Sequence, residues 1–162
     1  MYSPKRKKGN IAEEVTVSYL KNNGFTIKDQ NYLKKWGEID IVAEKYGKVH
    51  FIEVKSSTWG KNDGFWETEE KIDWKIELFS TKGGQAREIW EHVLSSNVSI
   101  DPVWNMTKKK KLRISRVIRT YLADRYREIE PDFQIDLVSV LLDFYRKTAY
   151  IKQIENILLE EV

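Results

Sequence analysis

Three residues of chemically reactive type, Asp40, Glu53 and Lys55, lie within two short apolar segments of the sequence. Both segments, 38–44 and 49–55, are rich in isoleucine and valine, which is typical of β-strands. Carboxylates are ligands that Mg²⁺ prefers, and a lysine beside them can orient or deprotonate a water molecule or stabilise charge on a phosphate. The combination predicts metal-assisted chemistry at a phosphate group.

The turn between the two segments decides whether the acidic residues meet. If Tyr46 and Gly47 are the turn residues, counting back along both strands places Asp40 opposite Glu53, with Cβ atoms roughly 4.5–5.5 Å apart. Strand alternation puts Lys55 on the same face as Glu53. Two carboxylates this close repel each other, and a bound Mg²⁺ or Mn²⁺ would remove the conflict. The alternative is a ladder of surface salt bridges on an exposed edge hairpin.

The hydrophobic periodicity predicts the elements that must position these residues. Helical spacing indicates helices at 11–22, with Asn10 as N-cap and Gly24 as C-terminal stop, and at 107–124. The remaining apolar runs indicate a short strand that starts at 25–27 and strands at 38–44, 49–55, 133–142 and 148–154. This order predicts an α/β fold in one domain, 1–162, with a mixed central sheet flanked by helices. A tryptophan-rich insertion at about 57–104 follows the third strand and includes a short predicted helix at 87–94.

Composition limits the setting in which the protein works. The chain has 162 residues, 41% of them hydrophobic and 33% charged, and it contains no cysteine. Disulfides and thiolate metal sites are therefore excluded. No apolar run is long enough to cross a bilayer, and the basic first residues lead into no signal peptide. We expect a cytoplasmic protein with no membrane partner.

Positive charge gathers on the second predicted helix. Seven basic residues and no acidic residue occur between 105 and 123. Four of them, Lys109, Lys110, Arg113 and Arg116, are predicted to bind a nucleic-acid backbone, preferably that of DNA. Lys110 and Lys111 share the apolar stripe of this helix, so one of them could point towards the sheet and reach a bound phosphate, but the favoured expectation is that these side chains extend outward from the first turn. The alternative is a solvated helix face with no nucleic-acid partner.

The segments G-E-I-D-I-V-A at 37–43 and H-F-I-E-V-K at 50–55 resemble the PD-(D/E)xK nuclease superfamily. More narrowly, the sequence resembles the YraN-like family of small bacterial proteins, related in fold to archaeal Holliday-junction resolvases. The opening helix, with Glu13, and the segments R-T-Y-L (119–122) and F-Q-I-D-L-V-S-V (133–140) resemble the same family. Two features depart from the pattern: Ile39 stands where the superfamily name has a proline, and the insertion is long.

The resemblance implies a restriction-endonuclease-like fold and a Mg²⁺-dependent endonuclease that hydrolyses phosphodiester bonds in DNA, including branched or single-stranded forms. It implies that Asp40 and Glu53 are metal ligands, that Lys55 is the catalytic lysine, and that Glu13 is an additional acidic residue of the site. The likeness to junction resolvases, which make two cuts, suggests a homodimer.

Two other functions remain open. The chain is alternatively a non-catalytic nucleic-acid-binding module on a nuclease scaffold, or a protein-interaction domain that uses the tryptophan-rich insertion. His50 is expected to point away from the proposed site. Asp136 is interpreted as a structural, hydrogen-bonding residue of its strand.

Overall fold

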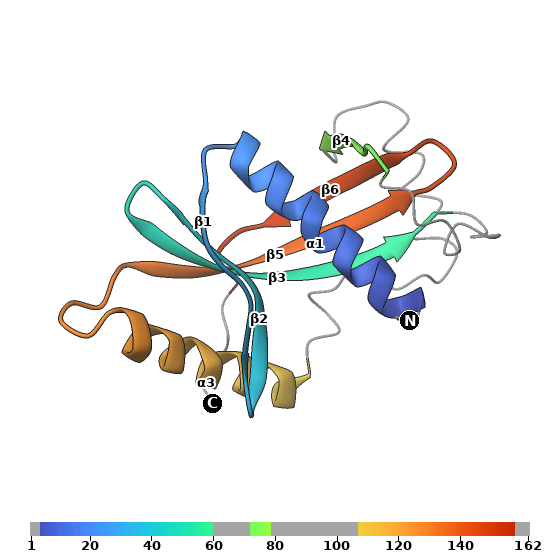
Figure 1. The fold of residues 1–162 in the computed structure, drawn as a ribbon. Coiled ribbons are helices and arrows are strands. Elements are labelled where there is room, and N and C mark those ends of the chain that lie inside the picture. Colours follow the sequence, from blue (N-terminus) through green and yellow to red (C-terminus); the bar gives the residue numbers. More distant parts are fainter. Residues whose placement is uncertain (1–3, 60–71, 79–106, 158–162) are drawn as a thin grey trace.

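The computed structural model describes residues 4–59, 72–78 and 107–157 as a mixed α/β fold with one six-stranded sheet and two helices (Figure 1). In chain order the elements are α1 (Pro4–Asn22), β1 (Thr26–Lys34), β2 (Gly37–Lys45), β3 (Lys48–Thr58), β4 (Lys75–Leu78), α3 (Lys108–Arg125), β5 (Phe133–Asp143) and β6 (Thr148–Ile154). The predicted helix at 87–94 lies outside the described residues. No helix in these ranges is long and apolar enough to span a lipid bilayer.

Helix α1 begins six residues earlier than the predicted N-cap at Asn10, which instead lies inside the helix. The earlier start is physically reasonable, because proline is tolerated in the first helical turn and the basic residues that follow Pro4 have good helix propensity. The predicted end is confirmed. Gly24 has a φ of 82°, and the backbone N–H of Phe25 donates to the carbonyl of Leu20 at 3.0 Å, as in a left-handed helix termination.

The strand order in the sheet is β1-β2-β3-β5-β6-β4. Strand β5 runs parallel to β3, and the chain between them includes α3, as a parallel crossover requires. Strand β1 is longer than predicted, with nine residues. Strand β4, a four-residue edge strand that pairs parallel with β6, lies in the insertion, for which no strand was predicted.

The two helices cover opposite faces of the sheet. Helix α1 packs on a cluster that includes Ile41, Ile52 and Val138. The apolar stripe of α3 packs on the other face, in a cluster that includes Val42 and Phe51. The predicted stripe is confirmed, since its five members are buried: Ile114, Val117, Ile118, Tyr121 and Leu122.

Strands β2 and β3 separate at the end distant from their turn. Their antiparallel register runs from Lys45↔Lys48 to Ile41↔Ile52, as predicted for these pairs, and Tyr46 and Gly47 have φ values of 52° and 76°, as a tight hairpin turn requires. Beyond this ladder, β2 continues beside β1, whereas β3 continues beside β5. Figure 1 shows the β1–β2 hairpin bending away from β3 towards α3. We call this divergence the fork.

Candidate active site

A cavity of about 450 Å³ lies at the fork, and we call it the fork pocket. It brings together residues from the start of β2, the middle of β3 and the first turns of α3. Its lining consists of Gly37, Glu38, Asp40, Glu53, Thr107, Lys109, Lys110, Arg113 and Ile114. Two predicted acidic residues and three predicted phosphate-binding residues therefore share one cavity.

Asp40 occupies the point at which the β2–β3 ladder ends. The predicted pairing of Asp40 with Glu53 is not part of the ladder, which ends one pair earlier. Instead, the backbone N–H of Val54 donates to Oδ2 of Asp40 at 2.7 Å. The pKa of Asp40 is raised to about 7, mainly by burial and next by the charge of Glu53, while the hydrogen bond from the Val54 N–H acts in the opposite direction. The ionised form of Asp40 is therefore disfavoured, and a positive charge placed nearby would stabilise it.

Glu53 is buried, with 8% of its surface exposed, and it holds two ammonium groups. The Nζ atoms of Lys55 and Lys110 both contact the same oxygen, Oε1. Burial lowers the pKa of Lys55, although contact with Glu53 opposes this effect. Burial also acts to lower the pKa of Lys110, but Glu53, Lys55 and Asp40 together act in the opposite direction, and the net shift of the pKa is upward.

The contact of Lys110 corrects the expectation that its side chain extends outward. Thr107 caps α3, and its side-chain oxygen accepts a hydrogen bond from the backbone N–H of Lys110 at 3.2 Å. The first turn therefore has a fixed orientation, and Lys110 is directed to Glu53. The position of Lys110 on the apolar stripe was the sequence signal for this contact.

Glu13 lies beside the fork pocket rather than in it. It is half-buried and lines a second cavity of about 450 Å³ together with Asn31 and Glu38, and Glu38 lines both cavities. Burial raises the pKa of Glu13, and a hydrogen bond with Asn31 opposes the effect, while the charges of Glu38 and Glu53 add to it. Glu13 is therefore within electrostatic range of Glu53, but no hydrogen bond described for these residues joins the two.

The remaining predicted phosphate-binding residues are on the outside of α3. Lys109, Arg113 and Arg116 are exposed, and the first two line the mouth of the fork pocket. A larger cavity, of about 610 Å³, lies between α3 and β5, and residues such as Ile118, Leu122 and Phe133 line it. None of the predicted acidic residues is part of that lining.

The donor set at the fork pocket suits a small divalent cation. Among the described ranges, no cluster of three histidine, aspartate or glutamate residues is arranged to enclose an ion. Mg²⁺ does not need such a cage, because it commonly takes one or two carboxylates and completes its shell with water and phosphate oxygens. Asp40 and Glu53 contribute two carboxylates of this kind to the lining of the pocket.

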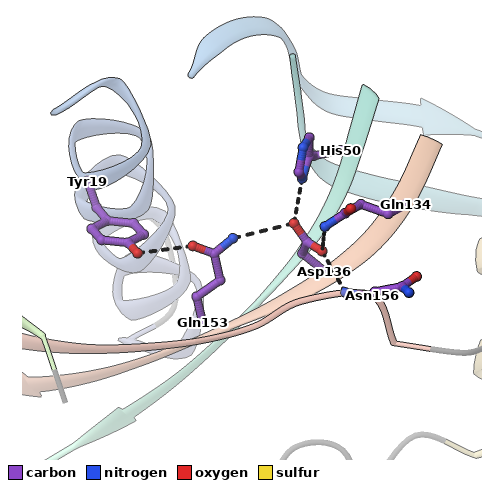
Figure 2. Close-up of polar contacts among 6 residues, drawn as sticks. All are labelled: Tyr19, His50, Gln134, Asp136, Gln153 and Asn156. Atoms are coloured by element: carbon purple, nitrogen blue, oxygen red, sulfur yellow. Dashed lines mark hydrogen bonds and ion pairs between the residues drawn. The ribbon is translucent and has the colours of Figure 1, made fainter. Parts of the chain in front are cut away.

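The opposite face of the sheet carries a separate polar network, which Figure 2 shows. Asp136 is fully buried and receives hydrogen bonds from Gln134, Gln153 and the backbone N–H of Asn156, and its Oδ2 lies 2.7 Å from Nδ1 of His50. Tyr19 of α1 donates to Gln153 at 3.0 Å, so the network ties α1 to the sheet. These contacts confirm Asp136 as a hydrogen-bonding strand residue and place His50 away from the fork pocket.

The structure thus has a mixed sheet with a pocket lined by carboxylates and lysines where two strands diverge. Comparison with other proteins identifies the family. The pattern of the uncharacterised protein family UPF0102 matches residues 12–77. A UPF0102 protein of Helicobacter pylori (strain HPAG1) is 30% identical over 152 residues, which cover 94% of this chain and 91% of that protein. The chain belongs to the UPF0102 family, which confirms the YraN-like resemblance at the level of the family.

Two more relatives have the same family name. A UPF0102 protein of Wolinella succinogenes is 27% identical over 154 residues, which cover 95% of this chain and 98% of that protein. A UPF0102 protein of Alkaliphilus oremlandii is 34% identical over 101 residues, which cover 62% of this chain and 79% of that protein. The similarity to the first of these therefore extends over nearly the whole chain.

Proposed function

We propose that the protein is a metal-dependent nuclease with a restriction-endonuclease-like fold that hydrolyses phosphodiester bonds in DNA. The observation that carries this proposal is the meeting of Asp40, Glu53 and Lys55 at the fork, next to the exposed cations of α3. An acidic pocket with basic residues at its mouth suits a ligand that is itself anionic but coordinates a cation, as a phosphodiester does.

The residues divide the work according to their positions. Asp40 and Glu53 would hold Mg²⁺ or Mn²⁺, and the bound ion would supply Lewis-acid stabilisation of charge that develops on the phosphoryl oxygens. Lys55 contacts Glu53 and has a lowered pKa, so its Nζ is suited to orient an attacking water molecule or to take its proton. Lys109 and Arg113 line the mouth of the pocket, where they would bind neighbouring phosphates of the strand.

Cleavage assays with matched variants test the proposal. Mg²⁺ or Mn²⁺ is titrated against labelled duplex, single-stranded and branched DNA. We expect nicking or cutting of at least one form, and a loss of rate of about 10²–10³-fold in Glu53→Gln and in Lys55→Met, because each removes a group from the transition state. Glu14→Gln is the control, since Glu14 is exposed on the helix that carries Glu13. Absence of cleavage of every DNA form with both ions would refute the proposal.

One observation favours a second function, a nucleic-acid-binding module without catalysis. The ammonium groups of Lys55 and Lys110 already compensate the charge of Glu53 without an ion. A module of this kind would bind DNA in a salt-dependent manner, so Mg²⁺ would not strengthen the binding and Glu53→Gln would not weaken it. Measurement of DNA affinity with and without Mg²⁺ separates the two functions.

A further inference from the structure

The single negative charge of Glu53 is in contact with two positive charges. Two ammonium groups contact one of its oxygens, one from its own strand and one from α3. Lys55 is two residues from Glu53 on the same face of β3, so one strand carries both groups. Lys110 reaches Glu53 from a different element at the boundary of the fork pocket, and it is part of the lining of that pocket, whereas Lys55 is not.

The position of Lys110 on this boundary is fixed by α3. Gly37 of β2 approaches the helix so closely that a Cβ atom there would lie 2.9 Å from Cγ2 of Val117. The Thr107 cap orients the first turn. From this turn, Lys110 extends inward to the carboxylate while Lys109 is exposed at the mouth of the pocket. A rotation of the Lys110 side chain alone would transfer its charge from Glu53 towards a ligand held at the mouth.

A divalent ion at Glu53 and an ammonium group on the same oxygen repel each other strongly, since both are cations at contact distance in a partly buried site. Binding of the ion would therefore displace one ammonium group. An ammonium group that is displaced towards the mouth of the pocket gains from a phosphate there. The two events favour each other.

We propose that Lys110 is a positioning residue that occupies Glu53 in the absence of a divalent ion and is released by the ion to bind a substrate phosphate. This inference rests on the proposed nuclease function, because it requires an ion at Glu53 and a phosphate at the mouth of the pocket. Through Lys110, binding of the ion and binding of nucleic acid become coupled, and the coupling is reciprocal by thermodynamic necessity.

The first test is direct titration of the intact protein with Mn²⁺ by calorimetry, without DNA. Lys110→Met keeps the apolar stem and removes the competing charge, so it should bind Mn²⁺ about tenfold more tightly than the wild type, within the usual range for coupled sites. Lys108→Met, an exposed neighbour on the same helix, and Lys110→Arg, which keeps the charge, should both bind Mn²⁺ with the wild-type affinity. A wild-type or weaker Mn²⁺ affinity in Lys110→Met overturns the inference.

The second test measures the reciprocal effect with a fluorescein-labelled branched DNA and Ca²⁺, which also prefers oxygen ligands. We expect Ca²⁺ to increase the DNA affinity of the wild type and of Lys110→Arg by about tenfold, and to have no such effect on Lys110→Met. An equal Ca²⁺ effect in the wild type and in Lys110→Met overturns the inference.

Glu53→Gln distinguishes the failure of this inference from the failure of the nuclease proposal. If Glu53→Gln binds Mn²⁺ as the wild type does, no ion binds at Glu53 and both are overturned. If Glu53→Gln loses Mn²⁺ binding while Lys110→Met behaves as the wild type, the ion site stands and only the exchange by Lys110 is overturned.

Discussion

Asp40→Asn should stabilise the folded protein at alkaline pH, although it removes a group of the candidate site. The ordinary pKa of an aspartate, 3.8, is raised in the folded chain to about 7, with burial as the main cause and the charge of Glu53 as the next. The folded state thus binds the Asp40 proton more tightly than the unfolded state. The resulting stability is fully present below about pH 3.8 and is lost as the pH rises through about 7.

The size of the effect follows from the interval between the two pKa values. At about 1.4 kcal/mol for each pH unit, the interval from 3.8 to about 7 corresponds to at most roughly 4 kcal/mol. Asparagine is neutral at every pH, and its amide oxygen can still accept the hydrogen bond from the Val54 N–H. The variant should therefore exceed the wild type in free energy of unfolding by up to about 4 kcal/mol near pH 8.5, and by less than half of that near pH 5.

Urea denaturation of both proteins at several pH values, without divalent ions, measures this difference. Glu14→Gln serves as the control, because it makes the same acid-to-amide change at an exposed position of α1. Addition of Mg²⁺ near pH 8.5 should stabilise the wild type, by about 2.7 kcal/mol at a hundredfold excess over the dissociation constant, and should not stabilise Asp40→Asn. A difference between the two proteins that is independent of pH, or a less stable variant near pH 8.5, would refute the reasoning.

Three further substitutions have defined expectations from the structure. Gly37→Ala should lower the free energy of unfolding by about 1–3 kcal/mol, measured by urea denaturation, because its Cβ would lie 2.9 Å from Val117; an unchanged value would mean that α3 moves freely. Tyr46→Asn should stabilise the protein by roughly 1 kcal/mol and so raise its melting temperature, because residue 46 has a φ of 52°, which asparagine tolerates better than tyrosine. A lower melting temperature would count against this. Arg113→Ala should weaken DNA binding and reduce the slope of log affinity against log salt by about one, and an unchanged slope would exclude a phosphate contact.

Local sequence rules predicted those parts of the fold that depend on neighbours in the chain. The turn at Tyr46 and Gly47 was predictable, because a glycine between two apolar runs favours a tight turn, and the turn sets the hairpin register. The stripe that begins at Ile114 identified the buried face of α3, because a helix repeats every 3.6 residues. Gly24 marked the end of α1 for a similar reason.

The parts that depend on distant residues could not be predicted. Strand β4 has only four residues, and it forms because β6 offers a partner that is more than seventy residues later in the chain. The fork is equally invisible, because nothing in the β-strand pattern before Asp40 indicates that β2 will leave β3 there. The direction of Lys110 was ambiguous, since a lysine on an apolar stripe can reach inward or extend to solvent, and only the presence of Glu53 opposite decides between them.

The fork also makes the distance between the two carboxylates depend on a hydrophobic interface. Helix α3 contacts β2 at Gly37 and β3 through the pair Lys110–Glu53, so it spans the gap that the diverging strands leave. Mg²⁺ binds oxygen at about 2.0–2.1 Å and Ca²⁺ at about 2.3–2.6 Å, so a change of a few tenths of an ångström in that gap would favour one ion over the other. The size of the cation preferred by such a pocket would then be tuned by aliphatic side chains such as Val117, which touch neither ion nor substrate.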